Sequence, residues 1–190
     1  MTQAARIGRG LKLVWLVGCL AMAGCPKKEA PPPTPLPGGP PPSGPSDPQW
    51  TAGIVKVERQ GLTMVTLRSV REARNEGFDR VVFEFGGTQV PGYHLEYVDK
   101  PIIKCGSGDP TEVAGQGWLQ VRLTPAQAHE GGQPTITERE RKPHLPIIQE
   151  LELTCDFEGE VTWVLGNARP NKYRVMELRE PTRLVVDVQQ

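Results

Sequence analysis

A proline-rich segment divides this chain into two parts that cannot belong to one fold. Residues 26–48 contain eleven prolines and three glycines in 23 residues, and Leu36 is their only large apolar side chain. Such a segment buries too little apolar surface to offset the entropy lost on ordering, and consecutive prolines favour extended polyproline II. We therefore expect residues 25–49 to form a disordered tether that reaches at most ~70 Å. Residues 50–190 are left to form one folded domain.

The first residues have the parts of a secretory signal. Arg6, Arg9 and Lys12 precede an apolar run at 13–22, and small residues follow that run. The run is about ten residues long, whereas a membrane-spanning helix needs about 20. We therefore expect residues 1–24 to be a signal peptide that is removed on export.

The end of this signal resembles a bacterial lipobox, at which the chain is cleaved just before a lipidated cysteine. Cys25 follows Ala23-Gly24 and is the preferred lipidation site, and Cys19 is the alternative. Several acyl chains on one N-terminus give stable anchoring, because each buried methylene adds about 0.8 kcal/mol. The sequence thus predicts an exported, membrane-anchored lipoprotein that faces the periplasm or the cell exterior. Pro26 in place of an aspartate after Cys25 permits sorting to an outer membrane.

Charge and aromatic content exclude one class of partner. Lys and Arg number 22, as do Asp and Glu, and aromatic residues make up 6% of the chain. Removal of residues 1–24 would leave 19 basic and 22 acidic residues. A chain with this balance has neither the basic surface nor the aromatic platform that nucleic acids require, so no nucleic-acid partner is expected.

From Trp50 onward the pattern is one of short strands separated by turns. The segments are rich in β-branched and aromatic residues, and several alternate apolar and polar residues with period two. They cover residues 54–57, 63–70, 80–85, 93–98, 118–123, 147–157, 160–166, 172–178 and 183–188. This spacing predicts an all-β fold, a sandwich or a barrel.

Two segments of the domain are expected to be irregular. Residues 69–76 (SVREARNE) are the one helical candidate, a short connection. Residues 124–146 are polar and contain four prolines, which predicts a long exposed loop.

Cys105 and Cys155 are the only cysteines of the domain. An even pair in an exported chain normally forms a disulfide, and closing a loop of about 51 residues would stabilise the fold by up to ~4 kcal/mol. Metal ligands and redox thiols are the alternatives, but neither a CxxC motif nor a nearby histidine supports them.

No pattern of catalytic or metal-binding residues is present. The three histidines, His94, His129 and His144, lack the paired spacing of zinc ligands, and we expect them on the surface. The chain has no nucleophile elbow and no phosphate-binding loop in a strand–turn–helix context. We therefore predict a protein that is not an enzyme, with no metal and no cofactor.

Two strands share an unusual pattern. Residues 79–85 (DRVVFEF) and 182–188 (TRLVVDV) each place an arginine and an acid four residues apart. With period two, Arg80 and Glu84 share the outer face of one strand, and Arg183 and Asp187 share that of the other. The alternative to a binding face is a solvated surface with mutually satisfied charges. Because exposed substitutions usually change stability by less than about 0.5 kcal/mol, replacing Arg80 and Arg183 should affect folding little.

These strands resemble those of the AMIN domain, and more closely the AMIN-like domain of exported bacterial lipoproteins. The resemblance covers residues 50–190 and includes five segments in the same order. They are residues 77–85 (GFDRVVFEF), 91–93 (PGY), 105–108 (CGSG), 153–155 (LTC) and the closing 182–188 strand.

The resemblance implies a β-sandwich of two sheets with a non-catalytic role in the cell envelope. AMIN domains proper are attached to peptidoglycan amidases and secretins and localise them to the cell wall. Here we expect the module to act without a catalytic or pore-forming domain. It implies binding of peptidoglycan or a wall-associated protein, with Arg80, Glu84, Arg183 and Asp187 as ligand-binding candidates. The alternative is an assembly subunit of a secretion or pilus machine.

Overall fold

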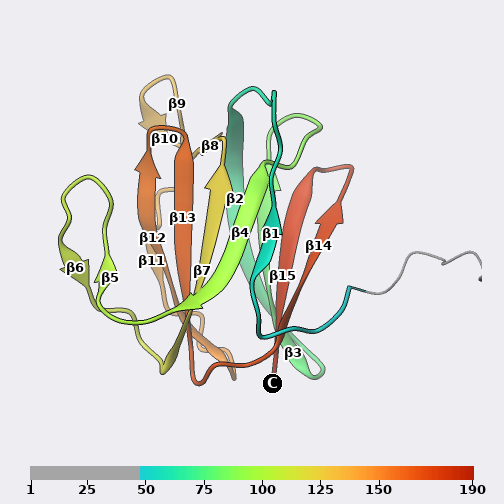
Figure 1. Cartoon of the computed structure of the whole chain (residues 1–190), viewed down its shortest axis with the longest axis vertical. Helices are drawn as coiled ribbons and strands as arrows, with labels where there is room; N and C mark the ends of the chain where they lie inside the picture. Colours follow the sequence, from blue (N-terminus) through green and yellow to red (C-terminus); the bar gives the residue numbers. More distant parts are fainter. Residues whose placement is uncertain (1–47) are drawn as a thin grey trace, which may run out of the picture. The chain divides into compact units, whose positions relative to one another are not determined.

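The computed structural model describes residues 48–190, which form strands and connecting loops (Figure 1). The strands are β1 (Val55–Val57), β2 (Val65–Asn75), β3 (Phe78–Phe85), β4 (Gly92–Val98), β5 (Ile102–Ile103), β6 (Pro110–Thr111), β7 (Gly117–Thr124), β8 (Ala126–Gln127), β9 (His129–Glu130), β10 (Gln133–Pro134), β11 (Glu140–Arg141), β12 (Ile148–Phe157), β13 (Glu160–Asn167), β14 (Tyr173–Leu178) and β15 (Arg183–Gln189). This part of the chain contains no helix, and so none that could cross a membrane. The predicted signal 1–24, with Cys19, and the predicted lipidation site Cys25 lie outside the described residues.

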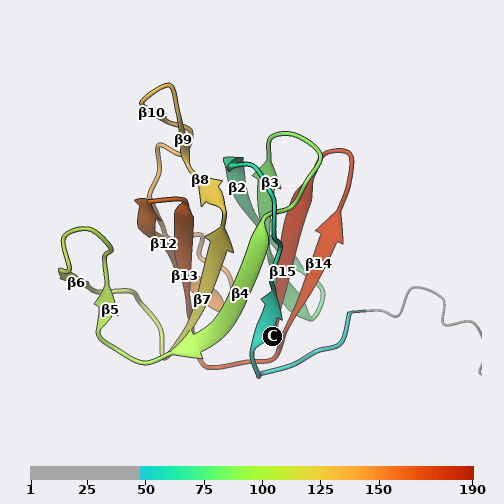
Figure 2. The ribbon, with the colours of Figure 1, turned by 45° about the horizontal axis from the view of Figure 1, so that its top comes forward.

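Two sheets pack face to face, which confirms the predicted β-sandwich. One has the strand order β1-β4-β7-β13-β12-β11, and the other has β14-β15-β3-β2-β8. Figures 1 and 2 show the strands of the two sheets from two directions. Trp163 of β13 and Phe83 of β3 are fully buried and meet between the sheets, with ring centroids 6.5 Å apart.

The core faces follow the alternation of the sequence. Val81, Phe83 and Phe85 of β3 point into the core, as do Leu184 and Val186 of β15. Burying one such side chain contributes about 1.5–3 kcal/mol, so a shift by one residue, which would expose the whole set, is strongly disfavoured.

The predicted helical segment 69–76 is wrong. Most of it belongs to β2, whose residues Ser69 to Asn75 pair with β3. Val70 is buried in the core. Gly77, with φ of 80°, closes a tight hairpin back to Phe78. The helix-forming residues of this segment yield to cross-strand pairing, since local propensity is a weak preference that tertiary context overrides.

The stretch 124–146 is mostly loop but is not exposed throughout. It contains the short strands β8 to β11, and it carries Ala126, Ala128 and Ile136 into the core with at most 4% of each residue exposed. The amide of Ala128 donates to Asp156 of β12 at 2.8 Å. The polar composition therefore concealed apolar contacts that hold the loop against the sheets.

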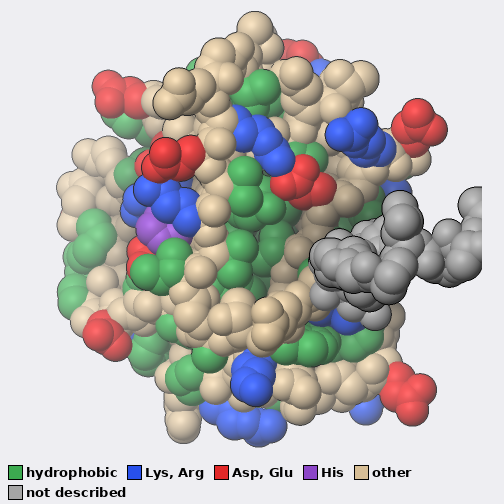
Figure 3. Space-filling model, turned by 45° about the vertical axis from the view of Figure 1, so that its right-hand side comes forward, with side chains coloured by type: hydrophobic (Ala, Val, Ile, Leu, Met, Phe, Trp, Pro, Cys, Tyr) green, Lys and Arg blue, Asp and Glu red, His purple; other side chains and the backbone are tan. Residues whose placement is uncertain are grey.

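One open side of the sandwich, between β1 and β14, is closed by a polar cluster. The Nη1 group of Arg59 donates to the carbonyl oxygens of Val90 and Pro91, both at 2.8 Å, and its Nη2 donates to Glu177 at 2.6 Å. The hydroxyl of Tyr93 also donates to Glu177, at 3.0 Å. Burial, together with the Glu177 charge, raises the pKa of Tyr93 to about 12. Figure 3 shows apolar side chains gathered in the middle of this side.

Residues 99–116 fold over the outer face of the six-stranded sheet, and we call this segment the disulfide lobe. Cys105 of the lobe is bonded to Cys155 of β12, with the two Cα atoms 5.1 Å apart, which confirms the predicted disulfide. Ile102 and Val113 form a small second core against β13. The lobe is thus attached both covalently and through apolar contacts.

Two buried carboxylates on the same face also hold the lobe. Glu150 accepts a hydrogen bond from the amide of Ala114 at 2.7 Å, and Glu152 accepts one from the Thr111 hydroxyl at 2.9 Å. Beneath them, Gly166 lets the lobe backbone approach, because an added Cβ would lie 2.0 Å from the Ala114 carbonyl oxygen. These contacts explain how acids in β12 can be almost completely buried.

Candidate functional site

The two strands that carry the predicted binding residues are neighbours in the five-stranded sheet. β3 and β15 are antiparallel, and their register places Arg80 opposite Asp187 and Glu84 opposite Arg183. The four side chains therefore belong to a single outer face. The sequence showed each arginine–acid pair within a strand, whereas the fold pairs Arg80 with Asp187 between strands.

Asp187 lies on this outer face and is nevertheless fully buried. Arg80 donates to it through Nε at 2.6 Å and Nη2 at 3.0 Å, and Arg174 of β14 donates through Nε at 2.9 Å. The hydrogen bonds that Arg80 donates to Asp187 raise the pKa of its guanidinium above the ordinary value, against the opposing effect of burial. With no exposed surface of its own, the Asp187 carboxylate orients the two guanidinium groups.

An aromatic pair packs on these arginines. The guanidinium carbon of Arg174 lies 4.6 Å from the ring centroid of Trp50 and 5.2 Å from that of Phe78. Arg80 lies 5.2 Å from the same Phe78 ring. Trp50 reaches this position because the next residue, Thr51, bridges to Tyr173 at the start of β14. Cation–π contacts of this kind restrict the guanidinium groups to one orientation.

The other end of the face is more open. Glu84 accepts a hydrogen bond from Arg71 of β2 at 2.7 Å, and 57% of the Arg71 side chain is exposed. The Nε of Arg183 donates to the Pro181 carbonyl oxygen at 3.1 Å. Between the two ends runs an apolar row, Val82, Val185 and Met176, that the β-sheet register aligns across three strands.

We call this surface the arginine face. It consists of Arg71, Arg80, Arg174 and Arg183, the acids Glu84 and Asp187, and the apolar row Val82, Val185 and Met176. Its four arginines exceed its two carboxylates, so the face carries a net positive charge. An apolar strip flanked by oriented guanidinium groups suits a ligand with both an apolar part and carboxylates.

The sequence alone missed half of the arginines on this face. Arg174 lies in the predicted 172–178 strand, and alternation along that strand could have placed it, but nothing local indicated that β14 borders β15. Arg71 lay in the segment interpreted as a helix, which hid its direction. Trp50 had no signal at all, since it precedes the first strand.

The histidines do not form a common site. His94 lies on β4, His129 on β9 and His144 in the loop before β12. The Nδ1 atom of His129 is hydrogen-bonded to the carboxylate of Asp156 at 3.0 Å. Within residues 48–190, no group of three or more histidine, cysteine, aspartate or glutamate side chains is arranged to hold a metal ion.

Comparison with protein-family models places this sandwich in a known domain family. The model of the AMIN-like domain matches residues 65–190, from the start of β2 to the last residue. The chain belongs to the AMIN-like domain family. The match confirms the resemblance seen in residues 79–85 and 182–188, and it includes every residue of the arginine face. Neither the curated proteins nor the solved structures contain a match to the chain.

Membership of the AMIN-like family indicates a module of the bacterial cell envelope. AMIN-like domains are generally non-catalytic.

Proposed function

We propose that this protein is a lipid-anchored, non-catalytic envelope module that binds peptidoglycan through its arginine face. The observation that supports this most is the excess of oriented arginines over carboxylates on that face. Each guanidinium has five N–H donors. Arg80 donates to Asp187 through two of its nitrogens and Arg174 through one, so donors on both remain available to a ligand.

The chemistry of the wall suits this surface. Wall peptides carry carboxylates, which an arginine can bind with two parallel hydrogen bonds. Their alkyl side chains can pack on Val82 and Met176, the part-exposed members of the apolar row. Glu84 can accept hydrogen bonds from amides and sugar hydroxyls. A mixed surface of this kind gives moderate affinity, which is sufficient for a domain held near an extended polymer.

The binding test is co-sedimentation of the full-length chain, in mild detergent, with purified peptidoglycan sacculi. The variant Arg71→Gln with Arg183→Gln removes the two arginines that are not bonded to Asp187. Arg74→Gln is the matched control, because Arg74 lies on the other face of the same strand and is exposed. We expect the double variant to be retained at least about tenfold more weakly than the parent, with an unchanged melting temperature. Equal retention of the double variant and the parent would refute the role of the arginine face.

The anchor is tested separately. We propose that Cys25 is the acylated N-terminus and that residues 25–49 hold the sandwich away from the membrane. Mass spectrometry of the membrane fraction should find an N-terminal acylated peptide that begins at Cys25 and no peptide that contains Arg6 to Lys12. A mature chain that begins at Cys19 would contradict the assignment.

An assembly role is a second candidate, and the edge strand β14 favours it. β14 has six residues and is the outermost strand of its sheet; among the described residues its one other backbone pairing besides β15 is the bridge from Tyr173 to Thr51. A partner strand could add to this edge. Neighbouring genes for a secretin or a pilus would favour this role, and amidase genes would favour wall binding.

A further inference from the structure

Three rows of side chains cross the outer face of the five-stranded sheet. β3, β15 and β14 are neighbouring strands (Figure 2), and each contributes one outward side chain to every row. In order, the rows are Arg80, Asp187 and Arg174; then Val82, Val185 and Met176; and then Glu84, Arg183 and Leu178. Basic groups therefore occupy the first and third rows, with an apolar row between them.

The first row retains one positive charge in a fixed position. Arg80 and Arg174 share the single carboxylate of Asp187, so two positive charges meet one negative charge. The ring of Phe78 lies 5.2 Å from each guanidinium carbon, and Trp50 adds a contact to Arg174. Because these contacts already hold both arginines, a ligand does not have to order them, which lowers the entropic cost of binding.

The third row retains a second positive charge. Glu84 lies opposite Arg183 in the register, but it accepts its hydrogen bond from Arg71, at 2.7 Å. Arg183 donates to the carbonyl oxygen of Pro181 and pairs with no acid among the described residues. Beside it, Leu178 has 37% of its surface exposed. Arg183 is therefore available to an anion, next to an apolar side chain.

The two positive charges are too far apart for one small anion. Arg183 and Asp187 are four residues apart on β15, and a strand rises about 3.4 Å per residue, so their rows are ~14 Å apart. A single carboxylate or phosphate group cannot contact both rows. Between them, Val82 and Met176 are part-exposed and present an apolar surface. A phosphate polymer would leave this surface uncovered, whereas an aliphatic side chain of a peptide can pack on it.

We propose that the arginine face binds one extended peptide that carries two carboxylates about 14 Å apart. One carboxylate accepts hydrogen bonds from Arg80 and Arg174, and the other accepts them from Arg183. In an extended peptide, side chains four residues apart point the same way and span this distance, while the residue midway between them faces the apolar row. This inference rests on the proposed function, because it names the peptide, within the wall polymer, as the part that the face recognises.

Two synthetic pentapeptides of equal composition and charge test the spacing. Acetyl-Glu-Ala-Val-Ala-Glu-amide holds its carboxylates four residues apart, and acetyl-Glu-Glu-Ala-Val-Ala-amide holds them side by side. Each is titrated into the full-length chain in micelles, and the arginine side-chain NMR signals of the ¹⁵N-labelled protein report binding. We expect the spaced peptide to bind at least about tenfold more tightly, because only its second carboxylate reaches Arg183 and forms a charge-assisted hydrogen bond.

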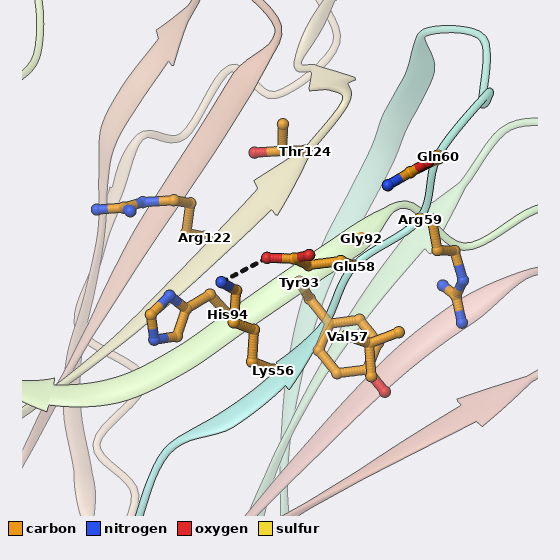
Figure 4. A pocket seen from close by; sticks show the side chains of 10 residues that line it. All are labelled: Lys56, Val57, Glu58, Arg59, Gln60, Gly92, Tyr93, His94, Arg122 and Thr124. Atoms are coloured by element: carbon orange, nitrogen blue, oxygen red, sulfur yellow. Dashed lines mark ion pairs between the residues drawn. The ribbon is translucent and has the colours of Figure 1, made fainter.

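Variants then locate the second carboxylate. Arg183→Gln should bind both peptides equally, because the third row has lost its positive charge. Its melting temperature should equal the parent's, since the hydrogen bond removed is one to a carbonyl oxygen. Lys56→Gln is the matched control, because Lys56 lies on the other sheet, in the pocket of Figure 4, where Glu58 balances its charge at 2.5 Å. This variant also loses one positive charge and should keep the parent's preference for the spaced peptide.

Competition with purified sacculi connects the peptide probe to the wall. The chain is bound to sacculi in mild detergent, and each pentapeptide is added in increasing amounts. We expect the spaced peptide to release the chain at a lower concentration than its isomer, because it occupies both the first and the third row.

Three results would overturn the inference. Equal affinity of the parent for the two peptides would show that the face does not read the spacing. A preference that survives in folded Arg183→Gln would place the second carboxylate elsewhere. Binding of the spaced peptide without release of the chain from sacculi would assign the face to an acidic segment of a partner protein. The proposed function fails separately, if sacculi do not retain the parent or retain the variant Arg71→Gln with Arg183→Gln equally well.

Discussion

Replacing Arg80 with alanine should destabilise the sandwich strongly, although Arg80 lies on an outer face. Arg80 supplies two of the three side-chain hydrogen bonds that Asp187 accepts, and Asp187 is fully buried. After the substitution only Arg174 remains, and the carboxylate keeps its desolvation cost with one donor. This contradicts the small effect that the sequence suggested for an exposed arginine.

The size of the effect follows from the bonds lost. A hydrogen bond to a charged group contributes about 1.5–3 kcal/mol. The Arg80 side chain is 30% exposed, which lets water replace part of the loss and favours the lower end of that range. We therefore expect Arg80→Ala to lower the free energy of unfolding by about 3 kcal/mol. For a domain of this size the melting temperature should fall by ~9 °C.

The assay is urea unfolding of the full-length chain with the disulfide intact, followed by tryptophan fluorescence. Arg183→Ala is the control, since its single hydrogen bond to a carbonyl oxygen predicts a loss of less than about 0.5 kcal/mol. Arg80→Ala combined with Asp187→Ala completes a double-mutant cycle, in which we expect a coupling of about 2 kcal/mol. If Arg80→Ala and Arg183→Ala lower the free energy of unfolding by the same amount, the buried Asp187 does not depend on Arg80 and the prediction is refuted.

Three further predictions concern other parts of the domain. Alkylation of the denatured, unreduced protein should label neither Cys105 nor Cys155, and labelling of both would contradict the disulfide. Gly166→Ala should displace the disulfide lobe, because its Cβ would lie 2.0 Å from a lobe carbonyl oxygen; faster hydrogen exchange confined to residues 99–116 would show this, and unchanged exchange would contradict it. Burial is the main cause that raises the pKa of Tyr93 and Tyr173 from 10.0 to about 12. Because the folded state holds these protons more tightly, stability should be complete below pH 10 and fall as pH rises toward 12, and a flat profile in urea melts would contradict this.

Alternation along single strands was enough to predict much of the fold. The branched and aromatic residues Val81, Phe83 and Phe85 indicated the core face of one strand, and the structure buries all three. The pair Cys105 and Cys155 was likewise identified from count and export alone. These features are local or compositional. The face to which a strand residue points depends on whether its position is odd or even along the strand, and with two cysteines in an exported domain there is one possible pairing.

The partners of each strand were decided by the tertiary structure alone. Asp187 looked like a solvated acid in the sequence, but β15 pairs with β14 on one side and with β3 on the other, which places Arg174 and Arg80 opposite it. The three rows across β3, β15 and β14 likewise exist only through the register of these strands, and β3 lies far from the other two in the sequence. The physical reason is that cross-strand pairing depends on the packing of the whole sandwich, so the sequence determined which way each side chain points and the fold determined which groups it meets.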